Sequence, residues 1–476
     1  MASSRKDNSQ SPPHRTDAGN AELFAALFRD GLRFDHKRER WLLYAEHWWT
    51  TDPDGELMRM AKRTARIRLR NSAAIGDDEK RKQEVQWALR SESLPRLQAM
   101  LTLAHTERQL ADPGDNWDAD PWLLGVANGV VNLHTGKLRP GAPSDRITLH
   151  TDIAFDPSAE CPRYDRFISE IFDGDPDLIS YVHRAVGYSL TGETTEQCFF
   201  CCHGEGANGK STFLNAVRHT VGSYACNLPF SAFELQTRST IGNDVATIPD
   251  RRFVTAIETD ESVRLNEARI KALTGGDPIT ARMLYREFFT FKPVAKFWLA
   301  FNRPPIVSDD SHGFWRRVHQ IPFVRQFDPV DEPGLENVLK AEAQGILAWV
   351  VRGCLEWQTC GLNPPVAVKE ATRAYREESN PLRDFVADRC ILHPDAQITA
   401  AAVWQEYLDW SIQNNERDCL QRPEFARRLE ALGLRKVRCG HDRDRTWLGI
   451  CRRQDAEGQH MLPPADVRAD ADVNLQ

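Results

Sequence analysis

A glycine-rich loop ending in a lysine and two hydroxyls is the first feature of this sequence that could do chemistry. The segment "GEGANGKS", residues 204–211, satisfies the pattern G-x-x-x-x-G-K-[ST]. In such a loop, backbone N–H groups surround phosphate oxygens, Lys210 reaches the β- and γ-phosphates, and the Ser211 hydroxyl binds Mg²⁺. The loop therefore predicts an ATP–Mg²⁺ site. Its expected nucleotide-binding residues are Gly204, Glu205, Gly206, Ala207, Asn208, Gly209, Lys210, Ser211 and Thr212.

The flanking segments match the strand and helix that this motif requires. "EQCFFCCH" predicts a buried strand, and "STFLNAVRHTV" predicts an amphipathic helix whose positive end faces the same phosphates. The cysteines at 198, 201 and 202 have no matching ligand pair elsewhere, so we interpret them as buried strand residues and not as a metal site.

Carboxylates follow the next apolar segment, "RRFVTAIETDES". One of them could hold Mg²⁺ and a second could orient the attacking water, although an acidic surface turn is the alternative. Glu258 ends the strand directly and is preferred for the metal. Asp260 and Glu261 remain open for the catalytic role.

Two further segments carry polar residues at strand ends. "VAKFWLAFNRPP" ends its apolar run at Asn302, whose amide could sense the γ-phosphate or hold the water, unless it is only a turn residue. In "GFWRRVHQIPF", Arg316 and Arg317 precede another strand. Either arginine could stabilise charge on the phosphoryl group in a neighbouring subunit, and a solvated basic turn is the alternative.

A short helix and a basic hairpin are expected between the acidic strand and Asn302. "NEARIKALTGGD" predicts a helix capped by Asn266 and stopped at Gly275. "PITARMLYREFFTFKP" predicts two strands that carry basic and aromatic side chains. Such a hairpin could grip one DNA strand without reading its sequence, or it could be purely structural. The candidate DNA contacts are Arg282, Arg286 and Lys292.

The order of these segments resembles superfamily 3 helicases, most closely the phage and plasmid primase–helicases that include poxvirus-type replication ATPases. The matching segments are "GEGANGKST", "ALTGGDPITARMLYREFFTF", "LAFNRPP" and "FWRRVHQIPF". Upstream, "PWLLGVANGVVNLHTGKLRP" and "VHRAVGYSLTGETTEQCFF" resemble the domain that precedes the motor in these proteins. The first of these also predicts a hairpin with Asn-Gly as its turn.

The resemblance implies an α/β P-loop ATPase core of the AAA+-like, superfamily 3 helicase type, working as a homo-hexameric ring on single-stranded and forked DNA. It also implies translocation, usually from 3′ to 5′. The implied roles are Lys210 and Ser211 on ATP–Mg²⁺, Glu258 as the acidic strand residue, Asn302 as sensor, and Arg316 as the finger in trans with Arg317 as the alternative. "ETDE" lacks the adjacent acidic pair of some relatives, so the catalytic carboxylate stays open.

Relatives often carry a primase, which needs paired carboxylates for two metals. Asp118 and Asp120 are the only suggestive pair outside the motor, in a loop before the predicted hairpin. We therefore expect a motor without a primase, and a separate primase or loader stays open as a partner.

The carboxyl-terminal part predicts three helices and a hairpin, which together suggest a winged helix. Residues 415–453 hold eleven Lys/Arg and six Asp/Glu, a surplus of five positive charges in a chain of net charge −7. The alternative is a winged helix used for protein contacts. The candidate phosphate contacts are Arg427, Arg428, Lys436 and Arg438.

Composition places the chain among ordinary globular proteins, with 41% hydrophobic and 27% charged residues. No run of about 18 apolar residues occurs, and eleven scattered cysteines favour a reducing compartment, so we expect a cytoplasmic protein. The expected regions are a disordered lead (1–20), a mixed α/β helicase-associated domain (21–165), the ATPase domain (166–330), a helical connector (331–380), a winged helix (381–455) and a disordered tail (456–476).

These patterns favour an ATP-driven DNA helicase for phage, prophage or plasmid replication. An alternative is an ATP-gated, DNA-binding initiator that melts an origin without processive unwinding. A small-molecule kinase is a third hypothesis, against which the arginine pair and the basic hairpin count.

Overall fold

The computed structural model describes residues 14–235, 244–258, 263–282, 287–309, 311–327, 334–379, 381–414, 419–439 and 444–457. The chain divides into two compact units. The first contains residues up to 304 together with 316–369, and the second contains 305–315 together with the residues from 370 onward.

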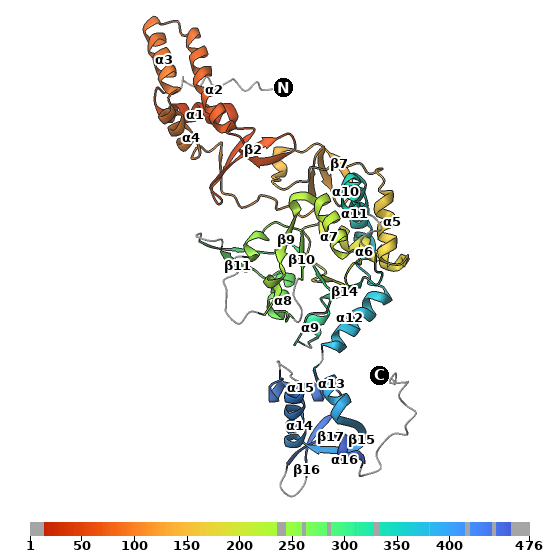
Figure 1. Ribbon diagram of the computed structural model, residues 1–476. Helices are drawn as coiled ribbons and strands as arrows, with labels where there is room; N and C mark the ends of the chain where they lie inside the picture. Colours follow the sequence, from red (N-terminus) through yellow and green to blue (C-terminus); the bar gives the residue numbers. More distant parts are fainter. Residues whose placement is uncertain are drawn as a thin grey trace, which may run out of the picture. The chain divides into compact units, whose positions relative to one another are not determined.

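The first unit begins with four helices and a small sheet (Figure 1). The helices are α1 (Asp17–Phe28), α2 (Glu56–Asn71), α3 (Asp78–Ser91) and α4 (Leu94–Ala104). The sheet has the order β3-β2-β1-β4, with β1 (Leu32–Asp35), β2 (Arg40–Ala45), β3 (Trp48–Thr51) and β4 (Ala111–Asp112). Helices α1, α2 and α4 share an apolar core that includes Phe24, Ala61 and Leu97. Strands β2 and β3 pair antiparallel as a hairpin, which contains Trp41, Trp48 and Trp49.

Helix α1 begins inside the region that the sequence predicted to be a disordered lead. The Thr16 side chain accepts a hydrogen bond from the Gly19 backbone N–H at 3.0 Å and caps the helix. A threonine cap of this kind satisfies one of the free N–H groups of the first turn. The prediction of disorder up to residue 20 is therefore wrong for residues 17–20.

The predicted hairpin around Asn128 and Gly129 is present, with its turn shifted by one residue. Strands β5 (Leu123–Val126) and β6 (Gly129–Asn132) pair antiparallel, and Val126 is opposite Gly129. The two turn residues are therefore 127 and 128, and Gly129 begins the second strand. A third strand, β7 (Lys137–Arg139), pairs with β6.

A parallel five-stranded sheet forms the centre of the first unit. Its order is β14-β8-β13-β10-β9, and all four pairings are parallel. The strands are β8 (Phe199–His203), β9 (Ala225–Pro229), β10 (Phe253–Ile257), β13 (Lys296–Phe301) and β14 (Val318–Pro322). The sheet confirms the predicted α/β core, because strands separated by helical segments pair in parallel.

Alternate residues of these strands face opposite helical layers, as the period of a strand requires. Phe200 stacks on Trp298 at 4.3 Å between ring centroids, and both pack into the large core with Phe213 of α7 (Lys210–Val221). On the other face, Phe199 and Phe297 contact α8 (Glu267–Gly275) through Leu273. Every strand residue of β13 is buried, so its run of apolar residues is covered on both faces.

Two buried cations join the sheet to α6 (Pro176–Leu190), which contacts α11 (Ala343–Cys360). Lys296, 1% exposed, donates to the carbonyls of Thr191 and Glu193, and Arg252 donates to the Leu190 carbonyl at 3.0 Å. Carbonyls at a helix carboxyl end carry partial negative charge and lack helical partners. The two cations satisfy them and hold the amino ends of β10 and β13 against the helix.

The remaining elements of the first unit match the sequence closely. Asn266 caps α8 by accepting from Arg269 N–H at 3.0 Å, and the helix ends at Gly275, the predicted stop, with Gly276 (φ +78°) as its C-cap. The predicted hairpin forms from β11 (Ile279–Arg282) and β12 (Phe288–Phe291), and its tip lies outside the described residues. Helix α5 (Pro162–Ile171) precedes α6. Helices α10 (Leu335–Ala341) and α11 belong to this unit, and α12 (Val366–Glu378) continues the chain.

The second unit contains the three predicted helices and the predicted hairpin, plus one strand that the sequence did not indicate. The helices are α13 (Pro381–Arg389), α14 (Ala400–Gln413) and α15 (Arg422–Ala431). The hairpin is β16 (Arg435–Cys439) with β17 (Asp444–Arg452). The extra strand is β15 (Cys390–Thr399), which pairs antiparallel with β17. Short helices α9 (His312–Trp315) and α16 (Arg453–Glu457) complete the unit.

Candidate functional site: a phosphate-loop pocket

The glycine loop connects β8 directly to α7, as the motif requires. Gly209 has φ +84° and is the residue before the first turn of the helix. The N-cap residue Gly209 has no side chain to cap the helix, and the Lys210 backbone N–H makes a long hydrogen bond of 3.5 Å to Asn208 Oδ1 of the loop. Free N–H groups at the positive end of a helix favour a phosphate group. The loop and α7 together form the anion-binding part of the site.

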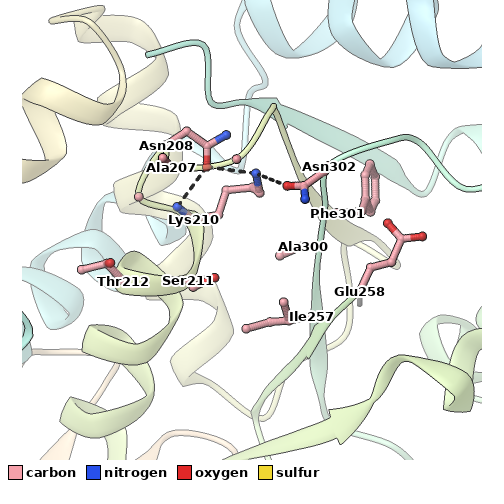
Figure 2. Close-up of a pocket in the computed structure, with 12 residues that line it drawn as sticks. Ala207, Asn208, Lys210, Ser211, Thr212, Ile257, Glu258, Ala300, Phe301 and Asn302 are labelled. Carbon is pink, nitrogen blue, oxygen red and sulfur yellow. Dashed lines mark hydrogen bonds between the residues drawn. The ribbon is translucent and has the colours of Figure 1, made fainter. Parts of the chain in front are cut away.

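Lys210 lies at the centre of the loop and is only 6% exposed. Its ammonium donates to Asn208 Oδ1 at 2.9 Å and to Asn302 Oδ1 at 3.1 Å, as Figure 2 shows, and to the Gly204 carbonyl. Burial lowers the pKa of Lys210 below its ordinary value of 10.5. A phosphate group in the pocket would supply the negative charge that this desolvated ammonium lacks.

Asn208 also fixes the loop to the end of β14. Its Nδ2 donates to the Phe323 carbonyl at 3.2 Å, and the Phe327 backbone N–H donates to the Ala207 carbonyl at 2.7 Å. A side chain at Gly204 would meet that same Phe323 carbonyl at 2.2 Å. The loop is therefore held in one shape before any ligand binds.

Glu258 and Asn302 reach the loop because β13 lies between β8 and β10. The carboxyl ends of parallel strands meet at one edge of a sheet, and Glu258 and Asn302 directly follow β10 and β13. The Glu258 backbone N–H donates to the Ala300 carbonyl at 2.9 Å. Figure 2 shows Glu258 across the end of β13 from the loop.

A pocket of about 380 Å³ lies at this edge of the sheet. Its wall combines loop backbone, an ammonium group, two hydroxyls, a carboxylate and two amides, which suits a phosphate chain better than an apolar ligand. Sequence reasoning missed three lining residues, Ile257, Ala300 and Phe301, although each is at or next to the last position of a predicted strand. The lining residues are Gly206, Ala207, Asn208, Gly209, Lys210, Ser211, Thr212, Ile257, Glu258, Ala300, Phe301 and Asn302.

The donor set fits Mg²⁺ bound with a nucleotide. Ser211 is exposed toward solvent and lines the pocket together with Glu258, so a hydroxyl and a carboxylate face one space. Mg²⁺ prefers oxygen ligands and commonly binds through one or two protein groups plus substrate phosphates. Asp260 and Glu261, the other candidates for the water-orienting carboxylate, lie outside the described residues.

Arg316 and Arg317 lie at the opposite edge of the sheet from the pocket of their own chain. Both directly precede β14, which runs parallel to β8, so they mark its amino end. Neither lines the pocket. Arg316 donates to Gln197 Oε1 at 2.6 Å, and burial lowers the pKa of Arg317. Neither arginine is positioned to touch a nucleotide bound by the same subunit.

The hairpin residues are accessible where the structure describes them. The Arg282 guanidinium packs over the Phe288 ring at 5.1 Å, Phe288 is 53% exposed, and Lys292 is exposed. Arg286 lies outside the described residues.

Of the four basic residues selected in the second unit, three are exposed and one is not. Arg428 is 5% exposed and donates to Glu424 Oε1 at 3.0 Å and to the Ser308 carbonyl. It anchors α15, and its expected role as a phosphate contact is corrected on this ground. Arg427 pairs with Glu424 at 2.7 Å, and Lys436 and Arg438 are exposed on β16.

The aspartates considered for a two-metal site are turn residues. Asp118 accepts from the backbone N–H groups of Thr148 and Leu149, at 2.7 and 2.9 Å, and Asp120 accepts from the Trp122 N–H. Among the described residues, no group of three or more His, Cys, Asp and Glu side chains could hold a metal ion. Cys198, Cys201 and Cys202 are buried in and beside β8, which confirms their structural interpretation.

Two family models match the chain. "D5 N terminal like" covers residues 21–173, and "Family of unknown function (DUF5906)" covers residues 202–317, which include the phosphate loop, Glu258, Asn302 and the arginine pair. The chain is distantly homologous to viral proteins described as putative helicases and putative primases. No helix among the described residues is both long and apolar enough to cross a membrane.

The relatives that the chain matches come from large DNA viruses. A "Putative helicase" of Acanthamoeba polyphaga mimivirus is 28% identical over 64% of this chain and 34% of its own length. A "Putative helicase" of Frog virus 3 is 22% identical over 67% of this chain and 42% of its own. A "Putative primase" of African swine fever virus is 25% identical over 60% of this chain and 33% of its own. The chain thus spans about a third to two-fifths of these relatives' lengths.

Among solved structures, the apo C-terminal region of NrS-1 is similar over 90% of this chain and 99% of its own, at 10% identity. The TM-score is 0.48, which is too low to establish a shared fold.

Proposed function

We propose that this chain is the ATP-hydrolysing motor of a replication-associated DNA helicase. The observation that carries the proposal is the pocket at the carboxyl edge of the parallel sheet, where Lys210, Ser211, Glu258 and Asn302 converge from three neighbouring segments. The homology to viral helicases gives that pocket its context. When ATP and Mg²⁺ are bound, the metal neutralises phosphate charge; Lys210 binds the phosphate chain, and Asn302 is placed to hold a water or the γ-phosphate.

We further propose that the motor is a superfamily 3, AAA+-like ring, a homo-hexamer, in which Arg316 or Arg317 completes the pocket of the neighbouring subunit. The pair is at the amino edge of the sheet, away from its own pocket, which is the position a trans-acting arginine needs. Mixing Lys210→Ala with Arg316→Ala protein tests this. Interfaces that carry one intact composite pocket should regain hydrolysis, whereas a finger acting in cis would leave the mixture as inactive as its components.

DNA is proposed to be gripped by the β11–β12 hairpin through Arg282, Arg286 and Lys292, next to the exposed Phe288 ring. The test is ATP hydrolysis with and without single-stranded DNA. Stimulation by DNA in the wild type, lost in Arg286→Ala with basal turnover intact, supports a translocating motor. Lys137→Ala, which removes an exposed lysine from β7, is the matched control. Hydrolysis indifferent to DNA would refute the motor proposal.

A DNA-binding initiator is the second candidate, favoured by the second unit. The order α13, β15, α14, α15, β16, β17, with the hairpin closing a three-stranded antiparallel sheet, supports the proposal that this unit is a winged helix. Arg427, Lys436 and Arg438 are its proposed phosphate contacts. An initiator would prefer one duplex sequence over random duplex of equal length, and a translocating motor would not.

A further inference from the structure

Helix α2 carries a concentration of positive charge that the proposed motor does not use. Its sixteen residues, "ELMRMAKRTARIRLRN", include six Lys/Arg and one carboxylate, in a chain whose net charge is −7. In the sequence this segment shows only a helical stripe of positive charge and no chemical motif.

Five of the six basic side chains share one face of the helix. At about 100° per residue, they fall within an arc of about 100°, and the buried residues occupy the opposite side. All five are exposed. They are Arg59, Lys62, Arg63, Arg66 and Arg70.

The sixth, Arg68, shows what a structural arginine looks like on this helix. It is 3% exposed, forms an ion pair with Glu84 of α3, and donates to Asn20 Oδ1 of α1 at 2.9 Å. It joins three helices. The five exposed basic side chains take no part in that packing, so packing in the core does not explain why they share one face of the helix.

Nearby carboxylates pair with only part of the stripe. Glu56 pairs with Arg59 at 2.5 Å and with Arg63 at 3.2 Å. Arg66 forms a longer ion pair with Glu92 at 3.7 Å, and the side chains of Lys62 and Arg70 form no hydrogen bond or ion pair with any residue that the structure describes. Lys62 and Arg70 are therefore uncompensated, and Arg66, with its one long ion pair, lies between them in the same row.

The chemistry of the stripe suits a polyanion and not an apolar partner. None of the large apolar side chains among the sixteen described residues of α2 is exposed, which argues against a membrane or a hydrophobic peptide. The three cations recur every four residues, or about 6 Å, over about 12 Å of helix. One strand of a duplex presents a phosphate every ~3.4 Å along the axis, so several phosphates fall within that length.

We propose that the face of α2 formed by Lys62, Arg66 and Arg70 binds the sugar–phosphate backbone of DNA without reading its sequence. The inference rests on the proposed function in taking DNA as the ligand. It assigns a second contact, in the amino-terminal helices, that is separate from the β11–β12 hairpin and from the second unit.

The test is the salt dependence of DNA affinity, measured by fluorescence anisotropy with a 30-nucleotide oligo-dT and a 30-bp random duplex. The variant is Lys62→Gln/Arg66→Gln/Arg70→Gln in the full chain. A plot of log affinity against log salt concentration has a negative slope. Losing three phosphate contacts should make this slope less steep, by about 3 on the duplex and about 2 on the single strand. Whichever probe shows the change identifies the form of DNA that the stripe binds.

The matched control is Lys369→Gln/Arg373→Gln/Arg376→Gln, which removes three exposed charges at similar spacing from α12, where three acidic residues balance them. A second variant, Arg66→Lys/Arg70→Lys, keeps the charge and should keep the wild-type slope. Basal ATP hydrolysis should be unchanged in all three variants.

Each outcome is decisive. A reduced slope in the α2 variant alone supports the proposal. A wild-type slope in that variant, or equal losses in the α12 control, overturns it while the DNA-dependent motor stands. A wild-type protein that binds neither probe overturns the motor proposal itself, and the α2 proposal with it.

Discussion

Replacing Gly209 of the phosphate loop should damage both stability and nucleotide binding, whereas replacing Gly206 of the same loop should leave stability close to that of the wild type. Gly209 has φ +84°, and a side chain there would meet Ile171 Cγ2 at 2.7 Å and the Phe167 ring at 3.2 Å. Gly206 has open space around it within 4 Å and no positive φ. Gly209→Ala and Gly206→Ala therefore form a matched pair within a single loop.

The expected cost follows from two terms. A non-glycine residue in the left-handed region costs roughly 1–2 kcal/mol. Forcing a methyl group against packed side chains costs typically about 1–3 kcal/mol. Gly209→Ala should therefore lose about 3 kcal/mol, whereas Gly206→Ala should stay within about 0.5 kcal/mol of the wild type. For a large domain, about 3 kcal/mol lowers the melting temperature by about 6–12 °C.

Nucleotide affinity provides the second readout. An added Cβ at Gly209 would lie 2.7 Å from Ile171 Cγ2, and moving it to an ordinary distance of about 3.7 Å would shift the start of α7 by about 1 Å. A misplacement of about 1 Å can reduce the rate at a site of fixed geometry by about 10²-fold. We expect ATP binding, followed with a fluorescent analogue, to weaken at least tenfold in Gly209→Ala. Equal melting temperatures and equal affinities in the two variants would refute the packing of α5 beneath the loop.

Three further predictions follow from buried and pocket-lining groups. His319 shares a hydrogen bond of 2.6 Å between its Nδ1 and the Tyr181 hydroxyl. Burial lowers the pKa of His319 from 6.5 to about 4, so as pH falls the unfolded chain takes up a proton at this histidine before the folded chain does. Stability present above pH 6.5 should therefore decline by about 3 kcal/mol between pH 6.5 and 4, and His319→Gln should flatten that slope in denaturant unfolding at graded pH. Arg68→Met should cost about 3–5 kcal/mol of stability by leaving Glu84 without its partner, measured by thermal unfolding, and the double variant with Glu84→Leu should recover much of it. Glu258→Gln should reduce ATP hydrolysis at least about 10²-fold while ATP binding persists, and unchanged turnover would remove Glu258 from the proposed mechanism.

Local sequence was enough to predict each element of the site but not their assembly. Particular residue types are required at the loop glycines, in the strand before them and in the helix after them. The same holds for the Asn266 cap and for the basic hairpin. The order of the strands in the sheet, by contrast, cannot be predicted from the residues of any one segment. The insertion of β13 between β8 and β10, which brings Asn302 to Lys210, comes from the packing of the helices on both faces of the sheet.

Side-chain direction also depended on tertiary structure. Arg427 and Arg428 are adjacent and look equivalent in sequence, yet one is exposed and the other is buried against Glu424 and the Ser308 carbonyl. Strand β15 is interrupted by His393, Pro394 and Asp395, which have little strand propensity and lie in the register shift between Leu392 and Gln397; the residues on either side of this shift pair with β17.

The sequence by itself determined that this protein has a phosphate loop, an acidic strand end and their order along the chain, because backbone conformation and ligand chemistry restrict which residues can stand there. Tertiary structure alone decided which strand ends meet, that the arginine pair lies at the far edge of the sheet from its own pocket, and which cations of α2 are exposed. These properties depend on burial, and burial is set by contacts between segments that are distant in the chain.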